Sequence, residues 1–449
     1  HIHDNISKDK SIMMDINLSP YGSQSVNPSP VNRMMASFAL DFRDKYDINL
    51  GVGYVNNHTI PQQKIARALD AVINNPARYK AAFNYGGPAG SQNLIDSLKR
   101  FIQKQRNENW SNDIFTNKRI IIGSSAVTSL LEGIAQIIKP GIVVTTDPMY
   151  YIYCEFLERS GFDILTIPED AKGIHVHLIE EKIRDYISQL SFFYIVTVGN
   201  PSSTILSNER LKNLIKLVKK ISDIADRKIP LFIDTAYEHL IHDQTIEKPI
   251  SGLSIDRNDL VYELGTLSKI LAPGLRIGYM IGPDNKFMSA MIQRINDVGF
   301  SASLMNQEIA SYLLDNHIEE QISEVNKRYQ KKAKAVMNCI IEKLGDEIYE
   351  IIGGSAGFYF YITFKDIITM EGSDFFKYCS RLTGNSSIDT SESVINPRVV
   401  YLPGAFCVHP QGDLVEKGKR QLRISYGYED IEMITKGITI MREAIEYAK

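Results

Sequence analysis

The sequence predicts an α/β fold built on a mostly parallel sheet that is flanked by helices, with a smaller α+β unit toward the C-terminus. Two observations lead to this prediction. Short, continuously apolar segments alternate with amphipathic helical patterns through the middle of the chain, which is typical of parallel strands buried on both faces. Polar residues follow directly after each of these segments, and the carboxyl ends of parallel strands share one edge of a sheet, where ligands bind.

The composition is that of an ordinary globular protein without a basic excess. The 449 residues are too many for one small core and predict two domains. Lysine and arginine number 50 against 53 aspartates and glutamates, so we expect no nucleic-acid partner, because such a partner requires a surplus of positive charge. No stretch approaches the roughly 20 apolar residues that cross a bilayer, so we expect no membrane partner.

The termini and the cysteines predict a cytoplasmic location. The N-terminus is polar and has no apolar signal core. The four cysteines have no paired spacing, which indicates reduced thiols that serve as buried packing residues. They are Cys154, Cys339, Cys379 and Cys407.

The N-terminal part is predicted to be an arm that ends in a short helix. Residues 1–47 contain a loop rich in proline and serine, followed by a helical pattern near Val31 to Phe42. This part is too short to hold an additional DNA-binding domain. The apolar segment Ile48 to Tyr54 follows, with Gly51 and Gly53 at alternate positions. Glycines there let a ligand approach the backbone, and a bulged strand would show the same pattern.

Two glycine-containing turns lead into predicted helices. The turn Asn84 to Gly90 precedes one helix, and Gly123-Ser124-Ser125 follows the apolar strand Ile120 to Ile122 and precedes another. A turn at a helix N-terminus presents free N–H groups and the positive end of the helix dipole, which suits a phosphate. Helix capping by serine is an equally good interpretation of the second turn alone. The apolar faces consist of Leu94, Leu98, Phe101 and Ile102 in the first helix, and Val127, Leu130, Leu131, Ile134 and Ile138 in the second.

The following strands deliver polar residues at their carboxyl ends. Because these ends meet at one edge of the sheet, we expect Asn200, Asp234, Tyr237 and Lys269 to lie close together. The strands, each with the residues that follow it, are Ile142 to Thr145 with Asp147 to Tyr151, Phe193 to Val198 with Gly199 to Ser203, Pro230 to Ile233 with Asp234 to Tyr237, and Leu260 to Leu264 with Gly265 to Lys269.

Lys269 is the predicted reactive residue. Thr266 and Ser268 place hydroxyls beside it, and Arg276 follows seven residues later behind a Pro-Gly turn. A lysine in such a setting suits a Schiff base, with the hydroxyls and the guanidinium available for a phosphate. A surface lysine before a loop is the simpler interpretation of a lone Ser-Lys pair. The expected convergence of Lys269 with other polar residues favours the reactive role.

Together these segments resemble the class I/II aminotransferases, pyridoxal phosphate enzymes of fold type I. The resemblance implies a mostly parallel seven-stranded sheet flanked by helices, plus a smaller α+β domain. Asn84 to Gly90 and Phe300 to Asn306 are most similar to the branch that holds valine:pyruvate and 2-aminoadipate aminotransferases. The matching motifs are Tyr85 to Gly90, Gly123 to Ser125, Asp147 to Tyr150, Asn200-Pro201, Asp234 to Tyr237, Ser268-Lys269, Pro273 to Gly278 and Arg423.

The resemblance assigns roles around pyridoxal 5'-phosphate. Lys269 would form the Schiff base with the cofactor and move a proton, Asp234 would pair with the pyridine nitrogen, and Tyr237 would bond the ring oxygen. These three are the implied catalytic residues. The implied cofactor-binding residues are Ser124, Ser125, Tyr150, Asn200, Asp234, Tyr237, Thr266, Ser268, Lys269 and Arg276, with Tyr85 added from the neighbouring subunit.

The resemblance also implies the partners. Amino acid and 2-oxo acid substrates would be held through their carboxylate by Arg423, with Asn200 and the backbone near Gly53 beside it. The contribution of Tyr85 across a subunit boundary implies a homodimer. No metal site is expected: His175 and His177 lie two residues apart, but no further cluster completes a set of ligands.

Two positions depart from the family pattern. The usual Asn-Pro-Thr-Gly is Asn200-Pro201-Ser202-Ser203 here, so a serine must adopt the turn that glycine normally takes. The usual Ser-Phe-Ser-Lys is Thr266-Leu267-Ser268-Lys269, which keeps both hydroxyls. Neither change removes a reactive group.

The expected division of the chain has four parts. Residues 1–47 form the arm and short helix, 48–75 the first part of the small domain, 76–315 the large cofactor-binding domain, and 316–449 an interdomain helix with the rest of the small domain. Apolar residues from Ile318 to Ile340 recur at three- and four-residue steps, which predicts the long helix. Strands are expected at Gly357 to Thr363 and Arg398 to Leu402.

The predicted function is transamination (EC 2.6.1 type), in which an amino group passes from an L-amino acid to a 2-oxo acid through a Schiff base on Lys269 by ping-pong half reactions. A C–S lyase or decarboxylase of the same fold is the alternative, and a non-catalytic cofactor-binding protein is a third interpretation. Arg423 favours transamination, because a held carboxylate suits deprotonation at Cα. Arg33 either meets an acidic substrate or faces solvent.

Overall fold

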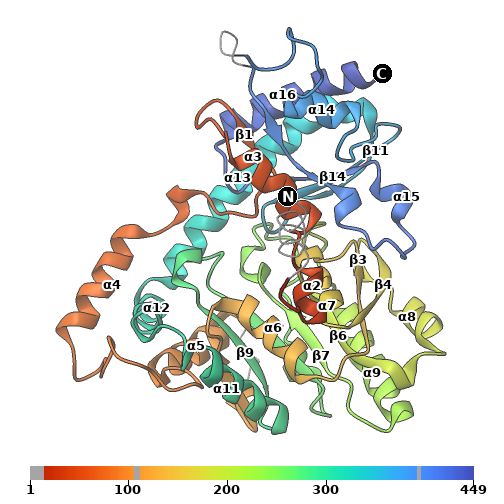
Figure 1. Cartoon of the computed structure of the whole chain (residues 1–449). Helices are drawn as coiled ribbons and strands as arrows, with labels where there is room; N and C mark the ends of the chain where they lie inside the picture. Colours follow the sequence, from red (N-terminus) through yellow and green to blue (C-terminus); the bar gives the residue numbers. More distant parts are fainter. Residues whose placement is uncertain (1–14, 106–111, 392–395) are drawn as a thin grey trace, which may run out of the picture.

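A sheet of eight strands forms the centre of the molecule (Figure 1). The computed structural model describes residues 15–105, 112–391 and 396–449. Parallel pairing joins the middle strands, β9 runs antiparallel to both its neighbours, and β5 runs antiparallel to β4. The strand order is β2 (Lys118–Ile122), β9 (Gly278–Pro283), β8 (Val261–Thr266), β7 (Leu231–Asp234), β6 (Leu190–Val196), β3 (Ile142–Asp147), β4 (Asp163–Asp170) and β5 (Gly173–Ile174).

This sheet confirms the predicted mostly parallel α/β architecture. Every strand expected between Ile120 and Leu264 is present, with its bounds shifted by a few residues. The seven strands that the resemblance implied are joined by an eighth, because the two-residue strand β5 pairs with the end of β4 at one edge. A strand this short has no sequence signal of its own.

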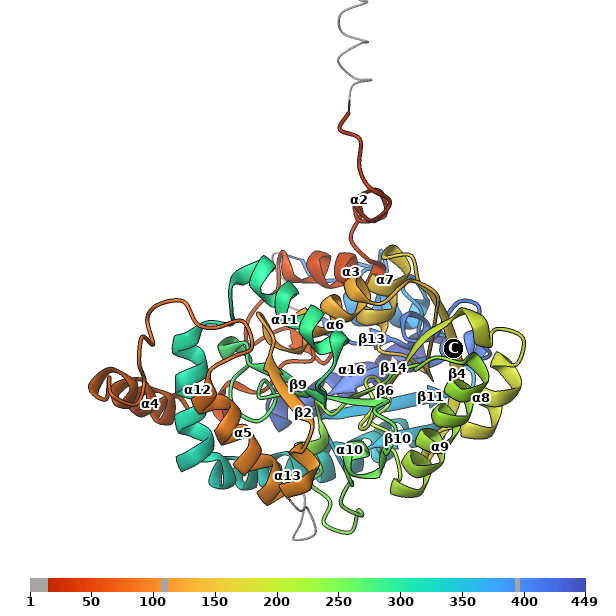
Figure 2. The ribbon, with the colours of Figure 1, turned by 90° about the horizontal axis from the view of Figure 1, so that it is seen from below.

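Helices cover both faces of the sheet, as Figure 2 shows. Successive side chains of a strand point to opposite faces: Phe192 and Tyr194 of β6 pack with α6, α7 and α11, whereas Phe193 and Ile195 pack with the helices of the other face, including α5 and α9. The helices around the sheet are α4 (Gln62–Asn74), α5 (Gln92–Gln105), α6 (Ala126–Ile137), α7 (Tyr151–Arg159), α8 (Val176–Ile183), α9 (Asn208–Ala225), α10 (Gly252–Ile255), α11 (Lys286–Gly299) and α12 (Leu304–Asn316).

A second, antiparallel sheet lies above the large one in Figure 1. Its order is β10 (Ile348–Gly353), β11 (Tyr359–Phe364), β14 (Gln421–Ser425) and β13 (Leu402–Pro403). The strand expected at Arg398 to Leu402 is divided: β12 (Val399–Val400) pairs with β1 (Ile48–Asn49), and β13 pairs with β14. The helices of this part are α13 (Ile318–Leu344), α14 (Asp374–Ser380), α15 (Val415–Gly418) and α16 (Ile431–Ala448).

The long helix α13 confirms the predicted apolar stripe. Its regularly spaced apolar residues from Ile318 to Ile340 are all buried. The four cysteines are free and buried, as expected of packing residues. The boundaries proposed at residues 47, 75 and 315 stay a prediction.

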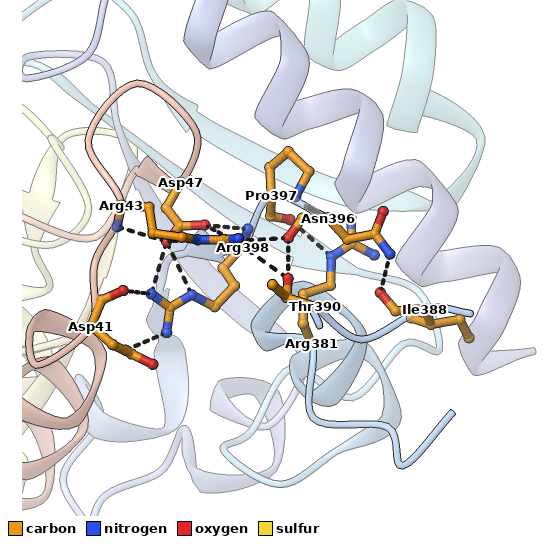
Figure 3. Close-up of polar contacts among 9 residues, drawn as sticks. All are labelled: Asp41, Arg43, Asp47, Arg381, Ile388, Thr390, Asn396, Pro397 and Arg398. Atoms are coloured by element: carbon orange, nitrogen blue, oxygen red, sulfur yellow. Dashed lines mark hydrogen bonds and ion pairs between the residues drawn. The ribbon is translucent and has the colours of Figure 1, made fainter. Parts of the chain in front are cut away.

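A network centred on Asp47 precedes β1, which forms a separate two-stranded parallel sheet with β12 (Figure 3). The arm consists of α2 (Pro20–Gln24) and α3 (Pro30–Ala39), and its first 14 residues lie outside the described part. The Asp47 side chain is fully buried, and its oxygens accept hydrogen bonds from the guanidinium groups of Arg43 at 2.7 Å and Arg398 at 2.8 Å. The Ile48 N–H donates to the Arg398 carbonyl at 2.8 Å, which sets the register of β1 on β12.

Within the described residues, no helix is long and apolar enough to cross a bilayer. Over the same ranges, no group of three or more histidine, cysteine or acidic side chains could hold a metal ion. His175 and His177 face each other edge to face, with ring centroids 5.2 Å apart.

Candidate active site

The predicted polar residues meet at the carboxyl edge of the large sheet. A cavity of about 260 Å³ lies there, between the ends of β7 and β8 and the segment that follows β1. Of the predicted site residues, those that line it are Gly53, Tyr150, Asn200, Asp234, Tyr237, Thr266, Ser268, Lys269 and Arg276. The parallel topology therefore brings together the side chains that the sequence predicted to converge.

Lys269 lies in the turn after β8, and its amine contacts the backbone of the segment that follows β1. Its Nζ donates a hydrogen bond to the Gly53 carbonyl at 3.0 Å and lies 5.5 Å from the ring centroid of Tyr237. Burial disfavours the ammonium, and the positive charges of Arg423 and Arg276 add to this effect, so the pKa of Lys269 is lowered to about 8. An amine with this pKa is a much better nucleophile near neutral pH than an ordinary lysine.

Asp234 ends β7 and is almost completely buried. Its Oδ2 accepts a hydrogen bond from the Tyr194 hydroxyl at 2.6 Å, and its Oδ1 accepts one from the Ala236 N–H at 3.0 Å. Burial raises the pKa of Asp234, while these hydrogen bonds and the charge of Lys269 oppose the rise. A cationic group in the cavity would stabilise the carboxylate further.

Arg423 is a fully buried cation on β14, 2% exposed. Its Nη1 donates to Oδ1 of Asn200 at 2.6 Å and its Nη2 donates to the Gly51 carbonyl at 2.7 Å. Its guanidinium lies 4.2 Å from the ring centroid of Tyr359. Among residues 15–105, 112–391 and 396–449, its buried Nε atom has no hydrogen-bond partner and its guanidinium has no carboxylate partner. A buried guanidinium in this state is prepared to bind an anion.

Tyr237 and Tyr359 link the two sheets at this site. Their hydroxyls lie 2.9 Å apart, and Phe358 packs edge to face on Tyr237 with centroids 5.6 Å apart. Burial raises the pKa of Tyr237 well above its ordinary value, so its hydroxyl stays protonated and can donate a hydrogen bond.

The phosphate-binding role predicted for Ser124 and Ser125, just before α6, stays a prediction. Ser124 and Ser125 do not line the cavity, whose wall at this point consists of Ala126, Val127 and Thr128. Next to them, Ala126 adopts a positive φ of 57°, and its N–H donates to the Arg276 carbonyl at 3.1 Å.

The N-terminus of α6 still provides free donors. The first helical hydrogen bond runs from the Ser129 N–H to the Ser125 carbonyl, so the N–H groups of Val127 and Thr128 have no acceptor within the helix. Arg276 is exposed and lines the same cavity. Thr266 is turned toward its own loop, where its hydroxyl donates to Ser268 Oγ at 3.0 Å.

Tyr85 and Arg33 also lie outside the cavity wall. Tyr85 is 76% exposed, and its ring packs on Phe300 with centroids 5.0 Å apart. Arg33 forms a bidentate pair with Glu371 at 3.1 and 2.8 Å on the surface, so it is a structural contact of α3 in this chain.

Sequence reasoning missed three residues of the site. Tyr194 and Tyr359 lie within largely apolar strands that also contain other hydroxyl side chains, so no local pattern distinguished them. Thr128 lines the cavity from the first turn of α6. The predicted phosphate-binding site was the serine motif that precedes this helix.

Comparisons with known proteins agree with this geometry. A family model described as aminotransferase class I and II matches residues 46–434. The uncharacterized HTH-type transcriptional regulator YisV of Bacillus subtilis is 24% identical over 403 residues, which cover 88% of this chain and 73% of that protein. The aromatic-amino-acid aminotransferase 1 of Thermococcus litoralis is 25% identical over 410 residues, which cover 89% of this chain and 88% of that protein.

A solved structure shows the same fold. The kynurenine aminotransferase of Pyrococcus horikoshii, in complex with PMP, with KYN as substrates and KYA as products, superposes with a TM-score of 0.79 at 22% identity. The match covers 98% of this chain and 98% of that chain. The large, mostly parallel sheet with a small antiparallel sheet is therefore a fold type I architecture.

Proposed function

We propose that this chain, which belongs to the aminotransferase class I and II family, transfers an amino group from an L-amino acid to a 2-oxo acid with pyridoxal 5'-phosphate. The observation that carries the proposal is the common cavity of Lys269 and Asp234, beside the buried Arg423 with its unsatisfied Nε. A nucleophilic amine, a buried carboxylate and an anion site are the groups that this reaction requires.

The donor set of the cavity fits pyridoxal phosphate. Asp234 would pair with the pyridine nitrogen, and Lys269 would bind the aldehyde carbon. The hydroxyl of Tyr237 would donate a hydrogen bond to the ring oxygen. The Oδ1 atom of Asn200 accepts a hydrogen bond from Arg423. The Nδ2 group of Asn200 is therefore available as a second donor to the ring oxygen of the cofactor. The phosphate would be held by Arg276 and by the N–H groups of Val127 and Thr128. Tyr150 would cover the ring face.

The residues of this chain would act as follows. When bound, the cofactor supplies an aldehyde that captures amines and a ring that accepts electrons from Cα. Lys269, with its pKa lowered to about 8, would hold the cofactor aldehyde as a neutral amine and would carry a proton to or from Cα. Arg423 and Asn200 hold the substrate carboxylate and so fix the orientation of Cα. The Gly53 carbonyl holds the lysine amine by a hydrogen bond of 3.0 Å.

A second candidate function is ligand sensing without turnover. The likeness to HTH-type transcriptional regulators, which extends over most of this chain, favours it. A regulator of this kind would keep the cofactor site and the carboxylate site, so the residues named above do not separate the two functions. The formation of a product distinguishes transamination from ligand sensing.

The test is absorption spectroscopy of the purified protein with pyridoxal phosphate and a panel of amino acids. The wild type is expected to form a visible band that Lys269→Ala abolishes. Lys332→Ala is the matched control, because Lys332 also has a pKa lowered to about 8 by burial but donates to the Gly427 carbonyl, away from the cavity wall. An amino acid that bleaches the band and releases its own 2-oxo acid supports transamination.

Other outcomes would contradict the proposal in distinct ways. Release of pyruvate and ammonia would indicate a C–S lyase, and release of carbon dioxide a decarboxylase. A band that amino acids perturb without any product would favour the sensing function. The absence of any band would exclude a catalytic role for Lys269.

A further inference from the structure

Tyr359, the first residue of β11, lies between the groups that the proposed reaction uses. Its side chain is 1% exposed. Its hydroxyl meets that of Tyr237, its ring supports the guanidinium of Arg423, and the same hydroxyl faces the backbone of Gly53. We infer that the Tyr359 hydroxyl is a positioning group: it donates its hydrogen to Tyr237, so that Tyr237 donates into the cavity, and it sets the distance of the Gly53 backbone from the site.

The direction of the hydrogen bond follows from the surroundings of the two phenols. Tyr237 lines the cavity, whereas Tyr359 lies behind it. The positive charge of Arg423 lies 4.2 Å from the Tyr359 ring and makes that phenol the better donor. When Tyr359 donates, the hydrogen of Tyr237 is free to point at an oxygen in the cavity. This part of the inference rests on the proposed function.

The spacing role is visible at Gly53. A Cβ at this position would lie 2.5 Å from the Tyr359 hydroxyl oxygen and 3.8 Å from the ring carbon that bears it. Apart from Gly53 and its two chain neighbours, no other heavy atom of the described residues would lie within 4 Å. Only the hydroxyl therefore excludes a side chain from position 53. Because the Gly53 carbonyl accepts the bond from Lys269, the hydroxyl also sets where the lysine amine rests.

The substitution Tyr359→Phe isolates the hydroxyl. Phenylalanine keeps an aromatic face for Arg423 and the packing of β11, since only one oxygen is removed. Tyr361→Phe is the matched control. Tyr361 is on the same strand and equally buried, and its hydroxyl bonds Gln421 at 3.1 Å.

The first test is a pH titration of the visible band formed by pyridoxal phosphate on Lys269. A hydrogen bond donated by Tyr237 stabilises the state with more negative charge on the ring oxygen, which is the deprotonated one. Removing the Tyr359 hydroxyl weakens that donor, so Tyr359→Phe should raise the midpoint by about half a pH unit, as expected for a modest hydrogen bond. Tyr361→Phe should leave it unchanged. An unchanged or lowered midpoint in Tyr359→Phe would overturn the assigned direction.

The second test is a double-mutant cycle on the cofactor-free protein, which does not depend on the proposed function. Gly53→Ala should lower the melting temperature by about 2–4 °C in the wild-type background, because the methyl group collides with the hydroxyl. In the Tyr359→Phe background the same change should cost little, since the collision is removed. Equal losses in both backgrounds would refute the spacing role. If no visible band forms in the wild type, the proposed function fails, while this cycle still decides the spacing role.

Discussion

At the scale of single residues, burial gives the site its chemistry. Lys269 has a pKa lowered to about 8 by burial and by its two arginine neighbours, whereas burial raises the pKa of Asp234. The charged form of each group is thus disfavoured in the cofactor-free protein. A bound cation beside Asp234 and an electrophile beside Lys269 would each relieve this penalty.

The lowered pKa of Lys269 predicts its labelling behaviour. Reductive alkylation requires the neutral amine, so in the cofactor-free protein the labelling rate of Lys269 should rise with pH and reach half its maximum near pH 8. An ordinary lysine reaches that point near its pKa of about 10.4. Peptide mapping by mass spectrometry at a series of pH values measures the midpoint for each lysine.

The variant Arg423→Gln provides the control for this measurement. It removes one of the two positive charges that lower the lysine pKa, so the Lys269 midpoint should move to higher pH. If Lys269 were labelled with the same midpoint as the exposed lysines, the assigned environment of its amine would be wrong.

Ser203 shows how one residue can depart from a family pattern and keep the local structure. It has a positive φ of 57°, as the Asn200-Pro201-Ser202-Ser203 motif predicted. A left-handed serine costs of order 1–2 kcal/mol relative to glycine. Its hydroxyl offsets part of this by donating to the Tyr359 carbonyl at 3.3 Å, a contact that glycine could not make.

At the scale of elements, the pairing of β1 with β12 positions two backbone carbonyl groups at the site. The strands are only two residues long, and the Asp47 network holds their starting ends (Figure 3). From there the chain reaches Gly51, whose carbonyl accepts from Arg423, and Gly53, whose carbonyl accepts from Lys269. The position of two site contacts therefore depends on a carboxylate outside the cavity.

Asp47→Asn should destabilise the fold by about 2–4 kcal/mol, because it leaves Arg43 and the 13%-exposed Arg398 without their shared anion. Urea unfolding measures this loss. Asp41→Asn is the control, since Asp41 binds the same Arg398 but is 75% exposed, and should cost less than about 1 kcal/mol. Equal losses would contradict the role given to burial.

The same network predicts a pH dependence. Burial alone would raise the pKa of Asp47, but hydrogen bonds from Arg43 and Arg398 outweigh it and lower the pKa to about 2. Its contribution is therefore complete above the unfolded-state pKa of about 3.9 and is lost as pH falls toward 2. The stability difference between wild type and Asp47→Asn should be constant from pH 7 to pH 5 and shrink from pH 4 to pH 3. A difference that does not shrink would refute the shifted pKa.

At the scale of the whole molecule, the exposed aromatic surface around Tyr85 suggests a second copy of the chain. Phe83, Tyr85, Val298 and Phe300 are each more than half exposed. Exposed apolar side chains that gather in one area mark interaction surfaces. The homodimer in which Tyr85 would reach the cofactor phosphate of the partner stays a prediction.

Mixing two variants, each of which lacks one site residue, tests the shared site. Lys269→Ala lacks the reactive lysine, and Tyr85→Ala should lose about tenfold or more in pyridoxal phosphate affinity, the value of a hydrogen bond to a charged group. In a mixed dimer, one of the two sites would regain both residues. Subunit exchange should therefore restore high-affinity binding to a fraction of the sites, measured by titrating the visible band. No recovery in a dimer shown to exchange would refute a site shared through Tyr85.

The sequence by itself determined the layout of this protein because that layout depends on local patterns. The spacing of apolar residues predicted the parallel sheet and the long helix α13. The polar residues at the strand ends predicted the convergence of Asn200, Asp234, Tyr237 and Lys269, because the strands of a parallel sheet end at one edge. Only the tertiary structure decided which groups touch. The first turn of α6 places Thr128 in the cavity wall, and the second sheet brings Tyr359 between Arg423 and Tyr237. Contacts between residues more than a hundred positions apart depend on how the two sheets pack, and no local pattern records that packing.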